Sequence, residues 1–416
     1  MTTQTAGDQQ NLSEYNRSRT LQYLYHHGIA SRAQIAQALH LTPAALSKIS
    51  NHLLSSGAII ETGPLEGKGN RRSIGLAVNT GQYRVLGVKF ARSLIQIGLF
   101  DLAGSAQAVW VDQATDYPTP AKAIEAVKQL IRSIMRQFTN IVAIGMAVPG
   151  PYLRSVGHTA VVSSMRQWRE VNFKAEFEHA FDIPVIIEQD ARAGALAQYL
   201  FDPQPRNENL AYYLLGEGIG LGVIDHGSVI NGALGTATEI GHVSVDVHGI
   251  PCDCGNVGCL ERYCSAVAIH DLLNEDGTIV PDSPTLTHHE ACIALFELAE
   301  RGDARAQELV RRIGTYVGYG CVTICNAFNP SRIVIGDIVA EAGEPLLERV
   351  REVVRERVLP ELVESTAIEL STLPTDAAVT GAAAAVAIMY ILDHPSRFFT
   401  PQTVHNATTN HNNQER

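Results

Sequence analysis

The period of the hydrophobic pattern changes near residue 80, and this change limits the folds open to the chain more than any other feature. Before it, apolar residues recur at helical spacing in three short segments. After Tyr83, short apolar strands alternate with helical segments, which is typical of mixed α/β layers. A chain of 416 residues is long enough for two or three domains. We expect disordered ends at residues 1–11 and 396–416, a small domain at 12–80 and a large one at 81–395.

The first eighty residues predict three helices. The first is expected from about Tyr15 to His27. Ser31 is the expected N-cap of the second helix, and Thr42, followed by Pro43, is the expected N-cap of the third. Only His40–Leu41 separates the second helix from the third, a spacing that favours a helix-turn-helix.

A hairpin with a basic loop is expected to follow the third helix, between the strand-like stretches Ala58–Glu61 and Ser73–Val78. Together these elements predict a winged helix-turn-helix of the α+β class. The third helix would present small and polar side chains to a major groove, and the loop would meet the DNA backbone or the minor groove. The predicted DNA-contacting residues are Arg32, Thr42, Ala44, Ser47, Lys48, Asn51, Lys68, Arg71 and Arg72.

The charge of the chain is unevenly distributed. A formal net charge of −11 is unusual for a DNA-binding protein, but residues 1–80 contain seven Lys and Arg against four Asp and Glu. Residues 1–80 therefore carry a net positive charge and are the part of the chain expected to contact DNA phosphates. The alternative is a small helical protein-interaction module whose charged loop is merely solvated.

The cysteines predict a metal site rather than disulfides. All seven lie beyond residue 250, an odd and clustered set. Cys252, Cys254 and Cys259, with His242 upstream, supply three thiolates and one imidazole, the donors that Zn²⁺ prefers in a closed structural site. The alternatives are buried reduced cysteines beside a hydrogen-bonded His242, or His248 as a substitute ligand. The remaining cysteines are expected in the core: Cys264, Cys292, Cys321 and Cys325.

Membrane insertion and secretion are not expected. No run approaches the roughly 18 apolar residues of a membrane span, and Met1–Asn11 lacks the apolar centre of a signal peptide. We therefore expect a cytoplasmic location.

Five motifs in the large domain carry a family resemblance. They are Ala147-Val-Pro-Gly-Pro151, Glu188-Gln-Asp-Ala-Arg-Ala193, Gly216-Glu-Gly-Ile-Gly-Leu-Gly222, Glu239-Ile-Gly-His242 and Cys252-Asp-Cys-Gly-Asn-Val-Gly-Cys-Leu-Glu261. In this order, behind a winged helix, they resemble the ROK family of repressors, open reading frames and sugar kinases. The resemblance runs from about residue 12 to 390. It implies the same zinc ligands and an α/β, two-lobed, sugar-kinase-like domain of the actin-like ATPase and ribonuclease H-like type.

The resemblance also implies a sugar pocket. Asp190 matches the catalytic base of ROK kinases, and sugar-contacting residues are matched by Glu239, His242 and Glu261. Two departures, Gln189 and Met165, stand where the family has asparagine. The effector is therefore expected to be an unusual sugar, a phosphorylated one held by Arg166 or Arg192, or a weakly bound one. The predicted sugar-binding residues are Gln189, Asp190, Glu239, His242 and Glu261.

Kinase activity is not expected. ROK kinases resemble Asp-x-Gly-Gly-Thr-Lys after the first strand, whereas this chain has Lys89-Phe-Ala-Arg-Ser-Leu94. Lys89 replaces the acid, and Ala91 and Arg92 replace glycines that let the backbone approach phosphates. Glu217 adds a negative charge to the second phosphate loop. The phosphate-binding motif is thus degenerate, and the protein is expected not to be an enzyme.

Together these features predict a transcriptional regulator, a repressor of genes for sugar uptake or catabolism. A sugar or sugar phosphate would modulate its affinity for a double-stranded DNA operator, and a dimer or tetramer would bind a pseudo-palindromic site. One alternative is an active sugar kinase with an accessory winged helix. Another is a repressor controlled by a phosphotransferase-system protein instead of a free sugar.

Overall fold

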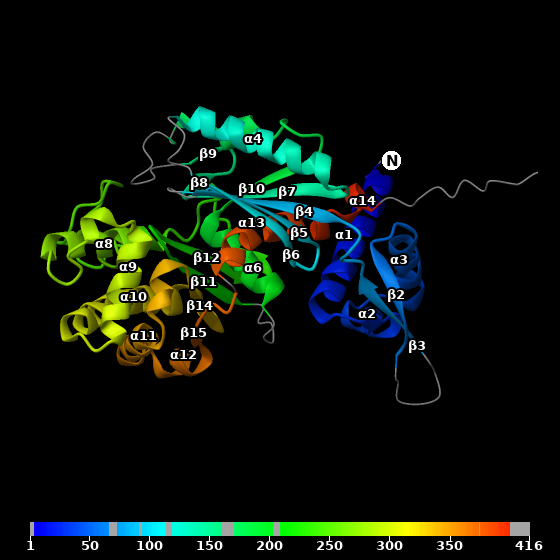
Figure 1. The fold of residues 1–416 in the computed structure, drawn as a ribbon. Helices are drawn as coiled ribbons and strands as arrows, with labels where there is room; N and C mark the ends of the chain where they lie inside the picture. The colour runs from blue at the N-terminus through cyan, green and yellow to red at the C-terminus, as the bar shows by residue number, and fades with distance from the viewer. Residues whose placement is uncertain are drawn as a thin grey trace, which may run out of the picture. The chain divides into compact units, whose positions relative to one another are not determined.

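A computed structural model describes residues 4–65, 73–90, 94–113, 119–159, 168, 170–202, 209–373 and 375–399. The chain forms two compact units, one of Met1–Gln82 with Tyr390–Arg416 and one of Tyr83–Met389 (Figure 1). Across the described ranges, no helix combines the length and apolar character that crossing a membrane requires.

The first unit contains three helices and a three-stranded sheet. The helices are α1 (Gln4–His27), α2 (Arg32–Ala38) and α3 (Pro43–Ser55). The sheet has the order β1-β3-β2, with β1 (Ala30–Ser31), β2 (Ile59–Leu65) and β3 (Ser73–Val78), all pairs antiparallel. The expected hairpin is confirmed as β2 and β3, whereas β1 was not expected because two residues show no strand pattern.

The helix starts of the first unit follow its sequence. The Ser31 side chain accepts a hydrogen bond from the backbone of Gln34, whose side chain returns one to Ser31, a capping box. Thr42 caps α3 through Ala45, with Pro43 in the first turn. Both N-caps are as predicted.

The structure corrects the disorder that we expected at both ends of the chain. Residues 4–11 form the first turns of α1, because a helix already nucleated by its packed part extends at little cost. At the other end, α14 (Pro395–Phe398) belongs to the first unit. Glu14 accepts hydrogen bonds from the backbone (3.0 Å) and hydroxyl of Ser396, and Phe399 is buried. Residues 400–416 lie outside the described residues.

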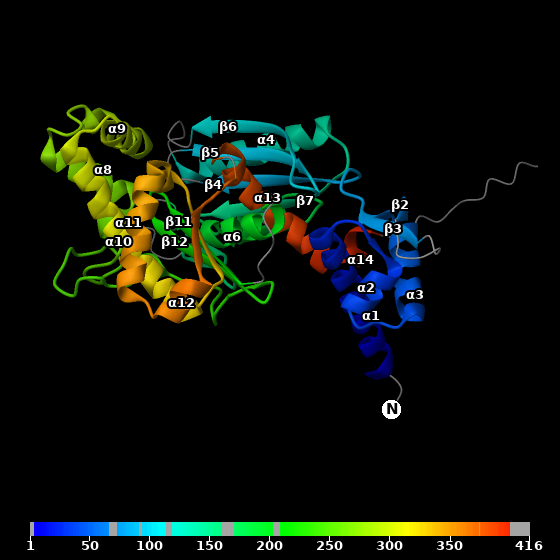
Figure 2. The ribbon, with the colours of Figure 1, turned by 90° about the horizontal axis from the view of Figure 1, so that it is seen from below.

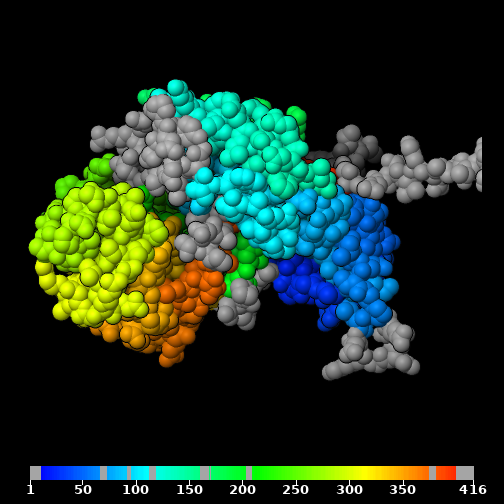
Figure 3. Space-filling view, viewed as in Figure 1, coloured from blue at the N-terminus to red at the C-terminus, as the bar shows by residue number. Residues whose placement is uncertain are grey.

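The second unit contains two five-stranded sheets with the same arrangement, three antiparallel strands followed by two parallel ones. The first, in the order β6-β5-β4-β7-β10, consists of β6 (Ala106–Gln113), β5 (Leu94–Asp101), β4 (Arg84–Phe90), β7 (Ile141–Val148) and β10 (Val185–Gln189). The second, β13-β12-β11-β14-β15, consists of β13 (Ser228–Val229), β12 (Ile219–Asp225), β11 (Leu210–Leu215), β14 (Arg332–Gly336) and β15 (Ala367–Leu370). The repeated arrangement makes the unit two-lobed (Figure 3).

Each sheet has its own helices (Figures 1 and 2). The first lobe has α4 (Pro120–Gln137), α5 (Phe173–Phe177) and the small hairpin β8 (Tyr152–Leu153) and β9 (His158–Thr159). The second has α7 (Glu261–Cys264), α8 (Ala266–Asp276), α9 (His288–Glu300), α10 (Ala304–Phe328), α11 (Glu344–Arg357) and α12 (Pro360–Ser365), with the 3-10 turns η3 (Ile240–His242), η4 (Ser283–Thr285) and η5 (Ile338–Ala342). Two further helices are α6 (Asp190–Phe201), which packs on β11 and β12, and α13 (Thr375–Asp393).

Two separate cores stabilise the lobes. One lies between the first sheet and α4, whose buried residues recur at helical spacing. The other lies around β11, β14 and α10. The second core contains Cys264, Cys292, Cys321 and Cys325, as predicted.

The fold gathers several strand ends at one place. In the first sheet, the parallel strands β7 and β10 end at Val148 and Gln189. In the second, β14 ends at Gly336, and η5 follows at once. Open α/β sheets bind ligands at the carboxyl ends of their strands, so this is where a pocket is expected.

Candidate functional site

A cluster of one histidine and three cysteines lies on the segment between η3 and α7. The ligand atoms of His242, Cys252, Cys254 and Cys259 all lie within 4.8 Å of one another. The Cys254 and Cys259 sulfurs are 3.6 Å apart, and His242 Nδ1 is 3.9 Å from the Cys252 sulfur. Metal bonds of about 2.0–2.3 Å in a tetrahedron place neighbouring donors roughly 3.6–3.8 Å apart. The cluster can therefore hold a metal ion.

The loop around this cluster depends on glycine at one position. Gly258 has φ +70°, and a Cβ there would lie 1.7 Å from the Asp246 carbonyl oxygen. Asn256 donates to the His242 carbonyl oxygen (3.1 Å), which ties the loop to η3. Burial raises the pKa of the Cys259 thiol to about 12, so a bound cation would have to displace its proton.

Asp190 lies at the start of α6, where it pairs with a lysine. Gln189 occupies the N-cap position of α6, so Asp190 is the first residue of the helix. Lys89, at the end of β4, is only 8% exposed, and its Nζ lies 3.9 Å from Asp190 Oδ2. Lys89, which stands where the resemblance predicts an acid, thus places a positive charge beside Asp190, where the resemblance predicts a base.

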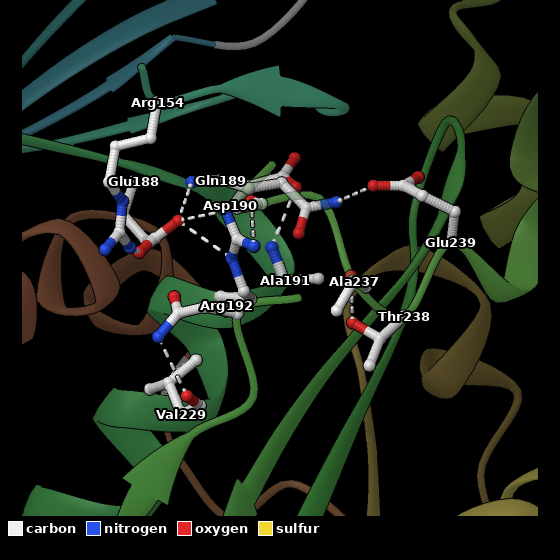
Figure 4. A network of polar contacts seen from close by, with 12 residues as sticks. Arg154, Glu188, Gln189, Asp190, Ala191, Arg192, Val229, Ala237, Thr238 and Glu239 are labelled. Carbon is white, nitrogen blue, oxygen red and sulfur yellow. Dashed lines mark hydrogen bonds and ion pairs between the residues drawn. The ribbon is translucent and has the colours of Figure 1, made fainter. Parts of the chain in front are cut away.

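Gln189 and Glu239 lie beside Asp190 (Figure 4). Gln189 Nε2 donates to Glu239 Oε1 at 3.4 Å. Within the described part of the chain, the buried Gln189 Oε1 has no hydrogen-bond partner, which leaves it able to accept from a ligand hydroxyl. Burial and then the charge of Asp190 raise the pKa of Glu239 to about 7, and Glu261 acts in the same direction.

The other predicted sugar-binding residues come from the metal-binding segment. Glu261 begins α7 and accepts a hydrogen bond from the Ile219 backbone (3.0 Å). His242 turns Nδ1 toward the cysteines. The fold therefore brings Gln189, Asp190 and Glu239 together, with Glu261 near enough to affect Glu239.

Arg192 is not available to a phosphate, which corrects one expectation. Its side chain is fully buried, and Nε donates to Glu188 Oε1 at 2.8 Å. Its guanidinium also donates to the Gly235 carbonyl, and Arg154 pairs with the same Glu188 (Figure 4). Glu188, near the end of β10, therefore already pairs with this guanidinium. Met165 and Arg166 lie outside the described residues.

The glycine-rich turn between β11 and β12 also contains an acid that a distant histidine contacts. Glu217, in the turn between β11 and β12, lies 2.8 Å from His288 Nδ1 at the start of α9. The next residue, His289, pairs with Glu341 of η5 at 3.0 Å. The sequence pointed to Glu217, Lys89 and Asp190 but not to the contacts they make, because each partner is distant in the chain. Ala91 and Arg92 lie outside the described residues.

The predicted DNA-contacting side chains of the first unit are mostly exposed. Thr42, Ala44, Ser47, Lys48 and Asn51 are exposed on α3 or at its cap, while Leu46, Ile49 and Leu53 are buried. Arg32 is half-buried and donates to Ser50 (3.1 Å) and Glu61 (3.1 Å), so intramolecular partners occupy its guanidinium. Lys68, Arg71 and Arg72 lie outside the described residues.

Comparison with known proteins gives consistent relatives. Residues 85–388 match a sequence model of the ROK family. The xylose repressor of Caldicellulosiruptor bescii is 26% identical over 388 residues, covering 90% of this chain and 96% of that protein. The DNA-binding transcriptional dual regulator NagC of Escherichia coli is 28% identical over 364 residues, covering 84% and 86%.

Solved structures show the same fold. A ROK family transcriptional regulator, a homologue of the E. coli MLC protein, has a TM-score of 0.76 at 24% identity and covers 93% of this chain and 99% of its own. A ROK hexokinase from Thermus thermophilus has a TM-score of 0.60 at 27% identity and covers 74% and 99%. The expected two-lobed sugar-kinase fold is confirmed.

Proposed function

This chain belongs to the ROK family, and from that premise we propose that it is a DNA-binding transcriptional regulator controlled by a sugar or sugar phosphate. We take it to be a repressor of genes for sugar uptake or catabolism, as the names of the compared relatives suggest. The observation that carries the proposal is the surface of α3, which is exposed, polar and lysine-bearing beside a β-hairpin.

The first unit would bind DNA as a winged helix. Its α2 and α3 form the helix-turn-helix, and α3 would enter the major groove with Ala44, Ser47, Lys48 and Asn51 toward the bases. Two such units in a homodimer or tetramer would bind the two halves of a pseudo-palindromic operator. Binding to chromosomal operators would place the protein in the cytoplasm.

The metal cluster would hold structural zinc. Three thiols and one imidazole satisfy four-coordinate Zn²⁺ without leaving a position for water, so the ion would stabilise rather than catalyse. The segment carrying the ligands also carries Glu239 and Glu261, so the ion would position the sugar-binding carboxylates.

A direct test uses the DNA upstream of the chain's own gene. We expect a specific gel shift with purified protein, and a change in affinity when xylose, N-acetylglucosamine or their phosphate esters are added. A sugar regulates only if it binds the DNA-competent and DNA-incompetent forms differently. Absence of a specific shift on upstream or neighbouring promoters would contradict the proposal, and a shift that no sugar changes would favour control by a protein partner.

The second candidate function is a sugar kinase, because Asp190 keeps the position of the family's base. We expect no sugar-dependent ADP release above background from ATP with xylose, glucose or N-acetylglucosamine. Lys89 pairs with Asp190, and Glu217 adds a carboxylate to the glycine-rich turn where a kinase would bind phosphate. A coupled assay with the Thermus thermophilus hexokinase as positive control measures this, and turnover that Asp190→Asn abolishes would support the kinase instead.

A further inference from the structure

A cavity of about 230 Å³ lies against Asp190 within the second unit. Its polar lining comes from Lys89 and Asp190 of the first lobe region, and from Tyr212, Asp337, Glu341 and Ser371. Apolar walls are formed by Leu214, Leu370, Leu373 and Ala382. The cavity shares Asp190 with the proposed sugar pocket and extends away from it toward the end of β14.

The position of Asp190 assigns a chemical role to this space. A base at this place accepts the proton of the sugar hydroxyl to which a kinase would transfer a phosphoryl group. A sugar already phosphorylated on that hydroxyl, bound in the same pose, would therefore carry its phosphate beside Asp190. The lining of the cavity decides whether such a phosphate is admitted.

The charges that line the cavity oppose a phosphate. Asp190, Asp337 and Glu341 are acidic, and among the described lining residues the one cation is Lys89. That cation lies 3.9 Å from Asp190, which already offsets its charge. A phosphate ester carries about −1.5 to −2 charges at neutral pH and would meet the two remaining carboxylates.

Neither of the neighbouring arginines lines the cavity. Arg192 and Arg154 both bind Glu188, and Arg192 is fully buried. His289, whose side chain is half-exposed, pairs with Glu341 and is not among the residues that line the cavity. A neutral sugar avoids the repulsion, since its hydroxyls donate to Asp190 and accept from neighbouring donors.

We infer that the effector of this protein is an unphosphorylated, neutral sugar, and that Asp337 and Glu341 exclude sugar phosphates. The inference rests on the proposed sugar pocket and narrows its ligand to one chemical class. Lys89 serves as an internal cation beside Asp190, in place of a bound nucleotide and its metal.

Calorimetry on the full-length, zinc-loaded protein tests the inference. The probes are xylose, glucose and N-acetylglucosamine, and the 6-phosphates of the last two. We expect at least one neutral sugar to bind, and the 6-phosphates to bind at least tenfold more weakly than the corresponding sugars. The double variant Asp337→Asn, Glu341→Gln should narrow that difference severalfold while leaving neutral-sugar affinity unchanged.

The variant is mild for the fold. Asparagine has the same shape as Asp337 and keeps the side-chain oxygen that accepts a hydrogen bond from the Ile338 backbone (2.8 Å). Glu348→Gln removes one exposed carboxylate from α11 and serves as a control for the loss of surface charge outside the cavity. A melting curve for each variant shows whether a change in sugar-phosphate affinity comes from the lost carboxylates or from misfolding.

The outcomes are distinguishable. Equal or tighter binding of a 6-phosphate would overturn the inference and leave a sugar-phosphate-responsive regulator standing. If the correctly folded double variant keeps the wild-type difference in affinity between sugars and their 6-phosphates, the proposed role of Asp337 and Glu341 is overturned. If no probe binds while the specific DNA shift persists, both the inference and the sugar response of the proposed function are contradicted.

Discussion

The double variant Lys48→Ala, Asn51→Ala is expected to weaken operator binding by about 30- to 100-fold without changing the melting temperature. Both side chains are exposed on α3, so their removal costs no packing. An amide that contacts a base edge and a lysine that contacts a phosphate or base together contribute on the order of 2–3 kcal/mol. Each 1.4 kcal/mol corresponds to a factor of ten in affinity.

Gel shifts or fluorescence anisotropy at fixed salt measure this effect. Lys122→Ala is the matched control, because it removes an exposed lysine from α4 of the other unit. Loss of Lys48 should also flatten the dependence of log affinity on log salt, by about one unit if its contact is to phosphate. Wild-type affinity in the double variant would show that α3 does not read the operator.

Loss of the metal site is expected to lower the melting temperature by on the order of 10 °C. We expect this from His242→Ala or Cys254→Ser and from prolonged chelation. The loop from Pro251 to Cys259 has few backbone pairs of its own, so four metal bonds would supply much of its order. Because Glu239 and Glu261 flank the ligands, sugar binding should fall together with metal content.

Metal content per chain, measured by atomic emission, and thermal melts with and without a chelator test this prediction. His248→Ala is the control, since it removes an exposed histidine from the same segment that does not belong to the cluster. The expected result is one zinc per chain in the wild type and in His248→Ala, and none in His242→Ala. A metal-free wild type with an unchanged melt would show that the four residues are only a packed cluster.

Local sequence predicted the elements that local chemistry controls. Ser31 and Thr42 cap their helices as expected, because the free N–H groups of a first turn need an acceptor nearby. The metal-binding segment was readable for the same reason: two glycines and three cysteines within eight residues close one loop. The C-terminal helix α14 was missed, because Ser396 and Phe399 gain their order from Glu14 and from packing.

The features of the candidate pocket can also be separated into those that the sequence predicted and those that only the structure showed. The sequence alone showed that Lys89 and Glu217 are unsuited to phosphate chemistry. The charge and volume of a side chain are known from the residue type and need no structure. Only the fold shows which residues pair with one another. Lys89 contacts Asp190, His288 contacts Glu217, and Glu188 binds Arg192. Two of these pairs join residues about 70 to 100 positions apart, and no periodicity encodes such a distance.

The change of pattern near residue 80 determined by itself that the chain has a small helical unit and a large α/β unit, since hydrophobic period follows directly from backbone geometry. Tertiary structure alone decided that residues from Tyr390 onward join the small unit and that acids surround the cavity beside Asp190. Both depend on which distant surfaces meet, and burial and charge complementarity act there only after the chain has folded.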